Sequence, residues 1–430
     1  SSGLLTIAGE LDAGSLDISG NVDIDGTLET DNLTVGGDQG SDGQVLTSTG
    51  SGVAWESAGG GGASAIDGLS DAVSGITNFT NSLILGHQTT GTLSSADGNT
   101  GVGYAAMDAI TSGDNNVAVG YLSLSAITTG ASNTAIGKGA LTTATTASDN
   151  TAIGFEALTA NTTGTDNTAV GYTAGTAVTT GSNNTFVGDV SGVAVTTGAS
   201  NTAIGADSFK TATTGDHNTA LGKQALEAAT TSSYNTAVGS SAGAAVTTGA
   251  NNVLVGYLAG TAITTGASNT AVGKGALDAN TTADNNTAVG LDALGANSTG
   301  ANNTAVGREA LLANTTASYN TALGANVLVS NTTGSENTAV GYASLDANST
   351  GVKNTAVGSG SLSANTTASN NVAIGYDTLY ANTTGAGNVA IGYRGLTANT
   401  TASNNVAVGY DALLANTTGA GNTALGKDAL

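Results

Sequence analysis

An uninterrupted 17-residue period runs through most of this 430-residue chain and limits what it can fold into. The pattern begins at Asn99 and returns every 17 residues up to Asn422, which gives twenty copies without an insertion or deletion. With the Asn numbered as position 0, every copy has Val, Ile or Leu at position 3 and Gly at position 4, and 17 copies have Ala at position 2. Such strict self-similarity is typical of a repeat architecture.

Each copy is too short for a helical hairpin, and its Thr-Ala-Val and Ala-Leu segments are separated by residues that favour turns. We therefore predict two short strands per copy, with each copy forming one coil of a parallel β-solenoid, or β-roll. Ordering 17 backbone residues costs about 17–34 kcal/mol, whereas burying one Val and one Leu contributes about 3–6 kcal/mol. A lone copy cannot fold, so we expect the coils to stack and the Val and Leu columns to form a continuous core.

Position 8 is Leu in 14 copies, but four copies have Gly there and a β-branched residue at position 11. These pairs are Gly175 with Val178, Gly192 with Val195, Gly243 with Val246, and Gly260 with Ile263. The exchange conserves volume and indicates that positions 8 and 11 border one interior space. Because so small a coil encloses a thin core, we expect another copy of the chain to cover one flank, which makes the protein a homo-oligomer.

The composition excludes several functions. The net charge is −23, so a basic surface for nucleic acid is not expected. The chain has no Cys, which excludes disulfides and thiolate chemistry. Its apolar runs fall short of the roughly 18–20 residues of a membrane span, so we expect no membrane insertion. We also expect no cofactor and no metal site.

The first part of the chain lacks the period. Residues 1–57 alternate apolar and polar residues between turns and predict a β-rich shaft or attachment region. Residues 58–98 form a Gly-rich linker and connector, in which the segment 82–86 is predicted to be a strand leading into the solenoid of residues 99–430.

The Asn at position 0 predicts an amide ladder along the rod, and the Gly at position 4 predicts a turn with positive φ or a close backbone approach. Tyr alternates with Lys, Arg, Ser and Asp at position 5, which indicates exposure. Exposed Tyr rings offer an apolar face to a sugar, although simple decoration of the ladder edge is the interpretation that the pattern favours. The candidate glycan-contacting residues are Tyr342, Tyr376, Tyr393 and Tyr410.

Asn-x-Ser/Thr sequons occupy position 11 in ten copies. Passage through a glycosylating secretory route would place glycans along one face. The same segment is good turn chemistry, and the Val and Ile at this position in other copies indicate partial burial. The candidate glycosylation sites are Asn280, Asn314, Asn331, Asn365, Asn382, Asn399 and Asn416.

The NTAVGYxAL-type copies resemble the head repeats of trimeric autotransporter adhesins, and the resemblance implies a β-roll in a fibrous homotrimer. Residues 16–37 and 41–57, together with the connector 65–75, resemble the shaft of bacteriophage tail fibres. Such fibres often end in a self-cleaving chaperone domain, which we expect to have been removed from this chain or never present.

These resemblances imply a structural, non-enzymatic tail fibre in the virion that binds itself, other tail proteins and a host-surface glycan or protein receptor. A bacterial surface adhesin or a self-assembling extracellular filament, possibly glycosylated, is the alternative. A polysaccharide-degrading spike is a third hypothesis, for which no converging pair of carboxylates is visible in the sequence.

Overall fold

The computed structural model describes residues 34–35, 38–39, 44–48, 53–57, 72–74, 76–86 and 90–430. All regular elements in these ranges are β-strands. The chain divides into two compact units, residues 1–65 and 66–430, which are described separately.

The first unit contains two antiparallel pairs. Strand β1 (Thr34–Val35) pairs with β2 (Asp38–Gln39), and β3 (Gln44–Ser48) pairs with β4 (Val53–Ser57) in a hairpin. These four short strands agree with the β-type pattern predicted for residues 1–57. The rest of that region and the Gly-rich linker lie outside the described residues.

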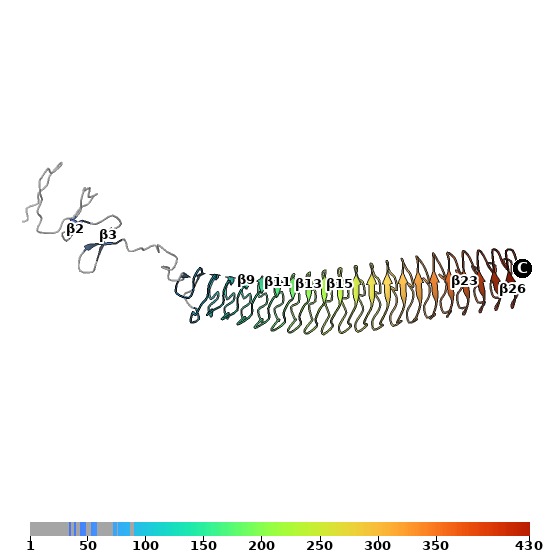
Figure 1. The fold of residues 1–430 in the computed structure, drawn as a ribbon, viewed down its shortest axis with the longest axis horizontal. Helices are drawn as coiled ribbons and strands as arrows, with labels where there is room; N and C mark the ends of the chain where they lie inside the picture. The colour runs from blue at the N-terminus through green and yellow to red at the C-terminus, as the bar shows by residue number, and fades with distance from the viewer. Residues whose placement is uncertain are drawn as a thin grey trace, which may run out of the picture. The chain divides into compact units, whose positions relative to one another are not determined.

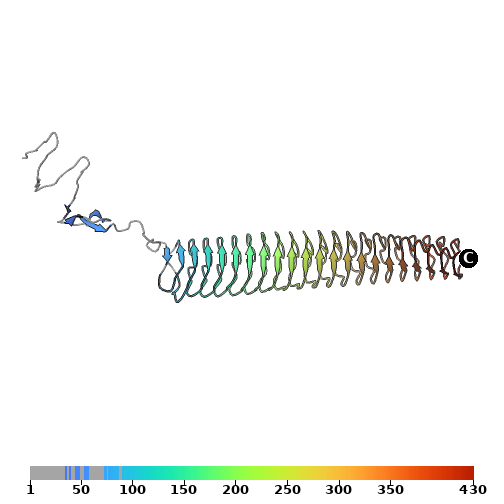
Figure 2. The same cartoon turned by 45° about the horizontal axis from the view of Figure 1, so that its top comes forward.

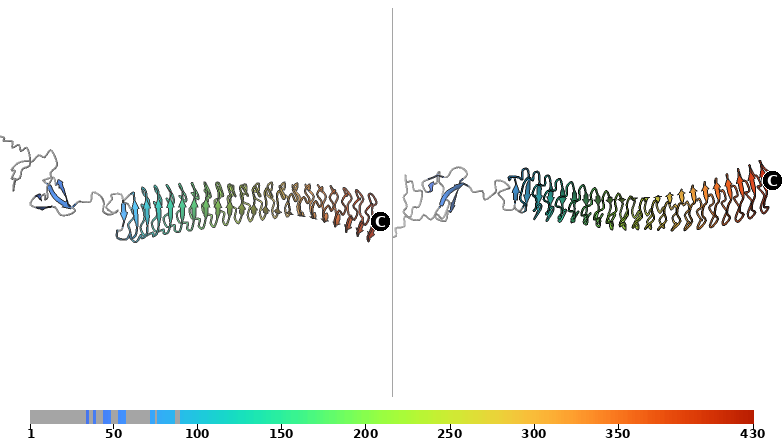
Figure 3. Two further views of the ribbon diagram at one scale, coloured as in Figure 1. Left: turned by 90° about the horizontal axis from the view of Figure 1, so that it is seen from above. Right: turned by 60° about the horizontal axis from the view of Figure 1, so that its bottom comes forward.

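The second unit is a long, gently curved rod of stacked coils (Figures 1, 2 and 3). Its strands are β5 (Ala72–Ser74), β6 (Leu83–Leu85), β7 (Thr100–Val102), β8 (Val117–Val119), β9 (Thr134–Ile136), β10 (Thr151–Ile153), β11 (Thr168–Val170), β12 (Thr185–Val187), β13 (Thr202–Ile204), β14 (Thr219–Leu221), β15 (Thr236–Val238), β16 (Val253–Val255), β17 (Thr270–Val272), β18 (Thr287–Val289), β19 (Thr304–Val306), β20 (Thr321–Leu323), β21 (Thr338–Val340), β22 (Thr355–Val357), β23 (Val372–Ile374), β24 (Val389–Ile391), β25 (Val406–Val408) and β26 (Thr423–Leu425).

Strands β6 to β26 pair in chain order, all parallel, and each residue pairs with the residue 17 positions away. Val289, for example, lies beside Val306. The parallel β-solenoid predicted from the period is therefore confirmed. With neighbouring strands about 4.8 Å apart, this ladder is about 100 Å long.

The ladder contains one coil more than the sequence repeat. Residues 82–86 and 90–98 belong to a coil that lacks the leading Asn, and the hydroxyl of Ser82 takes its place by accepting the backbone N–H of Asn99 at 2.8 Å. The strand predicted within 82–86 is confirmed as β6. Strand β5 pairs antiparallel with β6, and Phe79 is fully buried beside it. This segment covers the otherwise open first coil, as solenoids require.

Each coil has one strand, not two. Positions 1–3 are extended, but the Ala-Leu segment is bent because positions 6 and 8 both have positive φ. Leu345 at position 8 has a φ of 53° and Ala343 at position 6 a φ of 46°. Backbone bonds between coils continue through the bend: the N–H of Leu345 donates to the carbonyl of Ser361 at 2.9 Å. The prediction of a second strand was wrong, because hydrogen-bonded turns stack as well as strands do.

The core also differs from the expected one. Ala at position 2 and Leu at position 8 are fully buried except at the C-terminal end of the rod, whereas the Val, Ile or Leu at position 3 faces outward. Val102 is 40% exposed and Leu323 is 48% exposed. The column at position 3 is continuous, as predicted, but it lies on the outer face of the sheet. The small Ala points inward because the coil is too thin for a larger side chain at that point.

Two places accept a large residue at position 2, and there the Gly residues of position 8 make room. A Cβ on Gly192 would lie less than 3 Å from the ring of Phe186, and a Cβ on Gly260 would lie 2.7 Å from Leu254. The same hypothetical atom on Gly260 would lie 2.8 Å from Ile263 at position 11. Positions 8 and 11 therefore share one interior space, as predicted, and position 2 shares it as well.

Both of the predicted reasons for Gly at position 4 apply: the residue has positive φ, and the backbone of the next coil approaches it closely. Gly341 has a φ of 132°, and a Cβ there would lie 2.6 Å from the carbonyl oxygen of Gly358 in the next coil. By contrast, Gly395 at position 7 has an ordinary φ, and its nearest neighbour, the Cβ of Ala390, would be 3.6 Å away.

We predict that Gly341→Ala destabilises its coil by about 2–4 kcal/mol, because strain and a backbone clash add. Gly395→Ala is the matched control and is expected to be neutral or slightly stabilising. Amide hydrogen exchange followed by mass spectrometry measures both variants coil by coil. Equal protection around residues 324–358 in Gly341→Ala and the wild type would contradict the close approach.

Candidate functional site

Among the described residues, no group of three or more His, Asp or Glu side chains is placed to hold a metal ion, and no helix could span a membrane. The polar side chains are instead arranged in columns along the rod. Two of these columns, formed by the Asn residues of positions 0 and 11, are buried. Two further groups, the polar cluster around Lys210 and the Tyr residues of position 5, are exposed.

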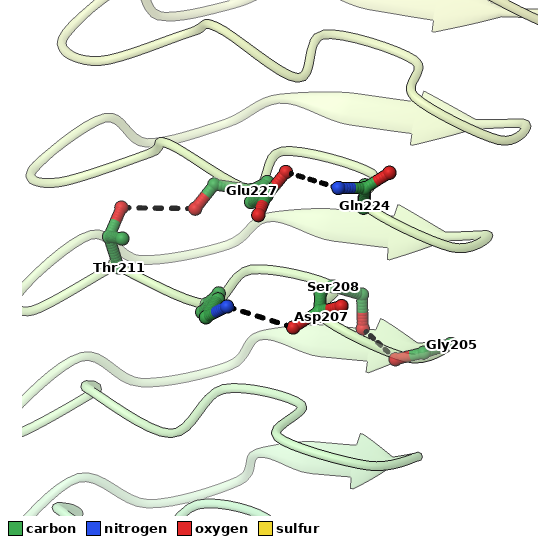
Figure 4. Close-up of polar contacts among 7 residues, drawn as sticks. Gly205, Asp207, Ser208, Thr211, Gln224 and Glu227 are labelled. Carbon is green, nitrogen blue, oxygen red and sulfur yellow. Dashed lines mark hydrogen bonds and ion pairs between the residues drawn. The ribbon is translucent and has the colours of Figure 1, made fainter.

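One exposed polar cluster lies on coils 201–217 and 218–234 (Figure 4). Lys210 contacts the carboxylate of Asp207 at 2.9 Å, and Gln224 donates to Glu227 at 2.9 Å. The hydrogen bond with Asp207 raises the pKa of Lys210, which keeps its amine protonated and unsuited to act as a nucleophile or base. Ser208 donates to the carbonyl of Gly205 at 2.8 Å. Thr211 donates to the carbonyl of Glu227 in the next coil at 3.0 Å, so the cluster also holds neighbouring turns in place.

The predicted amide ladder at position 0 is confirmed. The side-chain oxygen of Asn116 accepts both the backbone N–H and the side-chain N–H of Asn133, each at 3.0 Å. The amide nitrogen of Asn133 also donates to the carbonyl of Ala147 at 2.8 Å. Each Asn thus connects three successive coils, and all but the last are buried.

A second amide ladder is formed by the Asn of position 11. It runs without a break from Asn280 to Asn416. Asn331 donates to the side-chain oxygen of Asn314 at 3.0 Å and to the carbonyl of Gly334 at 2.9 Å, and it accepts the amide of Asn348 at 2.8 Å.

Burial in this ladder does not fit the glycosylation hypothesis. Six of the seven candidate sites are fully buried, with the amide nitrogen donating to neighbours: Asn280, Asn314, Asn331, Asn365, Asn382 and Asn399. The seventh, Asn416, is half-buried and donates to Asn399 and Gly419. A glycan on such a nitrogen would separate the coils, so the folded ladder does not favour glycosylation at these residues, which stays a hypothesis.

The Tyr side chains at position 5 are exposed, as predicted, and they stack on one another. Tyr376, Tyr393 and Tyr410 form a continuous stack with ring centroids 5.5 Å and 4.9 Å apart. Both faces of Tyr393 are therefore covered by rings, which leaves its edge and hydroxyl for a ligand. Tyr342 differs, because its neighbours one coil away are Ala325 and Ser359. Of the four candidate glycan-contacting residues, it is the most exposed, at 61%.

The sequence reasoning missed one surface, the outer face of the parallel sheet. We define the outer sheet face as the side chains of positions 1 and 3 from coil 82–98 to the last coil. Position 1 is Thr or Val in all twenty repeats, and position 3 is Val, Ile or Leu. A signal was present: position 2 is almost invariably Ala, as a tight interior demands, while position 3 accepts three different side chains.

No protein-family model, curated protein or solved structure matches this chain.

We predict that Asn331→Ala lowers the stability of the coils around it by about 2–3 kcal/mol, because it leaves buried partners without a hydrogen bond. Hydrogen exchange of residues 314–348 measures the effect. Thr333→Ala, which changes an exposed residue of the same turn, is the control. Equal exchange in the two variants would show that the ladder contributes little.

The carboxylates of Asp278 and Asp292 make the stability of the solenoid depend on pH. Burial and the charge of Asp292 raise the pKa of Asp278 above its ordinary value of 3.8. A raised pKa in the folded state means that the folded chain holds this proton more tightly than the unfolded chain does. Stability is therefore lost as the pH rises from below 3.8 through the raised pKa.

We predict that Asp278→Asn raises the melting temperature at pH about 7, and that the gain disappears below pH about 3, where both states of Asp278 are protonated. Thermal unfolding followed by circular dichroism at the two pH values measures this difference. A gain of the same size at both values would show that the carboxylate charge is not its cause.

Proposed function

We propose that this chain is a structural fibre protein of a virion, a tail fibre that attaches to the host surface, and that it assembles as a homotrimer through the outer sheet face. The observation that carries the proposal is the continuous apolar column at position 3. It accompanies every strand from β6 to β26 and faces outward along the whole rod.

The size of this surface supports association. Two side chains along each strand span about 7 Å, so a face about 100 Å long presents about 700 Å², of which the apolar column at position 3 makes up about half. Contiguous apolar patches larger than a few hundred Å² are rare on monomers and mark interaction sites. β-branched side chains in register also give a flat surface, which suits the same face of another copy.

A β-branched, uncharged face of this kind favours a second copy of the chain over a charged or irregular partner. The trimer count rests on the resemblance of the repeats to adhesin heads. A long rod held together along its length suits a protein that carries a recognition surface away from a particle, and the resemblance of residues 16–37 and 41–57 to fibre shafts supports a virion as that particle.

We predict that the double variant Val306→Asp, Leu323→Asp dissociates the oligomer, because it places two charges within the apolar column. Light scattering coupled to size-exclusion chromatography measures the mass. The control is Thr316→Asp, Thr333→Asp, which adds the same charges at exposed turn positions of the same coils. A wild-type mass of one chain, or an unchanged mass of the column variant, would overturn the assembly.

The attachment function is tested separately by electron microscopy of native particles with a gold-labelled antibody against the solenoid. We expect label on the tails of virions. Label on a bacterial surface or on free filaments would instead support the adhesin or filament and overturn the tail fibre, whatever the oligomer.

A further inference from the structure

The aromatic column at position 5 has one gap that differs from the rest. Ser359 stands between Tyr342 and Tyr376, one coil from each. Nowhere else along this position are two Tyr residues separated by a single small residue. The residue that follows Ser359 is Gly360, so this coil carries almost no side-chain bulk where its neighbours carry rings.

One wall of the gap is oriented by stacking. Tyr376 packs one face on Tyr393, with an angle of 11° between the rings. Its other face therefore looks along the rod towards the coil of Ser359. Neighbouring strands are about 4.8 Å apart, so Tyr342 lies about 10 Å from Tyr376 along the column. A group midway between them would be about 5 Å from each ring, which is within cation–π range.

At other coils, cationic side chains already lie over the aromatic rings of position 5. The amine of Lys138 lies 5.2 Å from the ring centroid of Phe155 in the next coil, and the amine of Lys427 lies 5.7 Å from the ring centroid of Tyr410. At the gap, no such side chain is available, because Ser359 occupies the place that Lys fills in those coils. The column spacing thus presents ring faces at the distance that a cation requires.

Negative charge also gathers at the gap. A Cβ on Gly360 would collide with the carboxylate of Asp377 and would lie 3.6 Å from the ring of Tyr380. Asp377 and Tyr380 therefore lie over Gly360, directly beside Ser359. The charge of Asp377 raises the pKa of Tyr376, in keeping with a carboxylate close to the hydroxyl of that side chain. The charge of Arg394, one coil further on, acts on Tyr376 in the opposite direction and more weakly. The nearer carboxylate therefore favours a cationic ligand over an anionic one.

We infer that this gap binds a quaternary ammonium group, held between Tyr342 and Tyr376 with Asp377 as the countercharge. A primary ammonium has three hydrogens that need acceptors, whereas ring faces suit a group that donates none. The inference goes beyond the proposed fibre function and does not depend on it, since it concerns side chains within coils 337–387 of one chain.

Isothermal titration calorimetry of the full chain with choline chloride tests the site. The neutral carbon isostere of choline, in which carbon replaces the nitrogen, is the ligand control. We expect choline to bind at least about tenfold more tightly than the isostere, because two ring faces and a carboxylate act on the charge. No binding of choline, or equal binding of the two, would overturn the proposal.

Ser359→Tyr is the decisive variant. It fills the gap with a ring, continues the existing stack and is therefore expected to fold, while choline affinity falls at least about tenfold. Ser240→Tyr is the matched control, because it adds a ring at the same exposed position beside Tyr257 and leaves the gap open. Asp377→Asn is expected to weaken binding about threefold. Undiminished choline binding by Ser359→Tyr would overturn the site.

Phosphocholine and trimethyl-lysine then distinguish the two sources of the same chemistry. Tighter binding of phosphocholine assigns a lipid or cell-wall head group, and tighter binding of trimethyl-lysine assigns a methylated protein. Either result supports recognition of the ammonium group by the ring faces.

Discussion

In-register stacking of identical positions is the constraint on which the whole rod depends. One coil buries too little to offset the roughly 17–34 kcal/mol needed to order its backbone, so each coil is stable only between neighbours. The Asn at position 0 makes this dependence specific, because its amide donates to the Asn of the coil before it and accepts the backbone N–H of the Asn in the coil after it. A residue inserted within a strand would turn the side chains beyond it to the opposite face, so the strands have to keep one register along the rod.

The second constraint is backbone conformation. Every repeat has positive φ at positions 4 and 6, the nineteen complete repeats have it at position 16, and every coil from Met107 to Leu413 has it at position 8. Yet only position 4 is always Gly. Positive φ costs a non-Gly residue about 1–2 kcal/mol, which burial of a Leu at position 8 offsets. At position 4 nothing can offset the cost, because the next coil's carbonyl occupies the space of a Cβ.

The period predicts which residues lie on one another, and for that reason the stacking of Val289 on Val306, the Asn ladder and the exposed Tyr column could all be predicted. It does not predict which face of a strand points inward. Either face of a Thr-Ala-Val strand could pack against a core, and side-chain size alone favours the face with the larger Val. The interior volume decides which side chain points inward. That volume depends on how sharply the residues with positive φ bend the coil.

At the candidate sites, too, the sequence predicts which residues lie in one column, whereas only the folded coil decides which atoms are exposed. The sequons of position 11 have the composition of glycosylation sites, and only the closure of the coil reveals that their nitrogens lie inside. The gap at Ser359 is visible in the sequence as an exception in a column, but its significance depends on knowing that neighbouring rings stack face to face. Composition indicates which groups are present; the stacking determines which atoms a ligand can reach.

The interior and the exterior of the rod vary independently. At position 11, the first half of the solenoid has mostly apolar residues such as Ile127 and Val195, whereas the second half has the unbroken amide ladder from Asn280 to Asn416. The column at position 3 remains apolar through this change, from Val102 to Leu425. If the outer residues served only the fold of one chain, they would be free to become polar where the interior does. Their uniformity supports the proposed contact of this face with another copy of the chain.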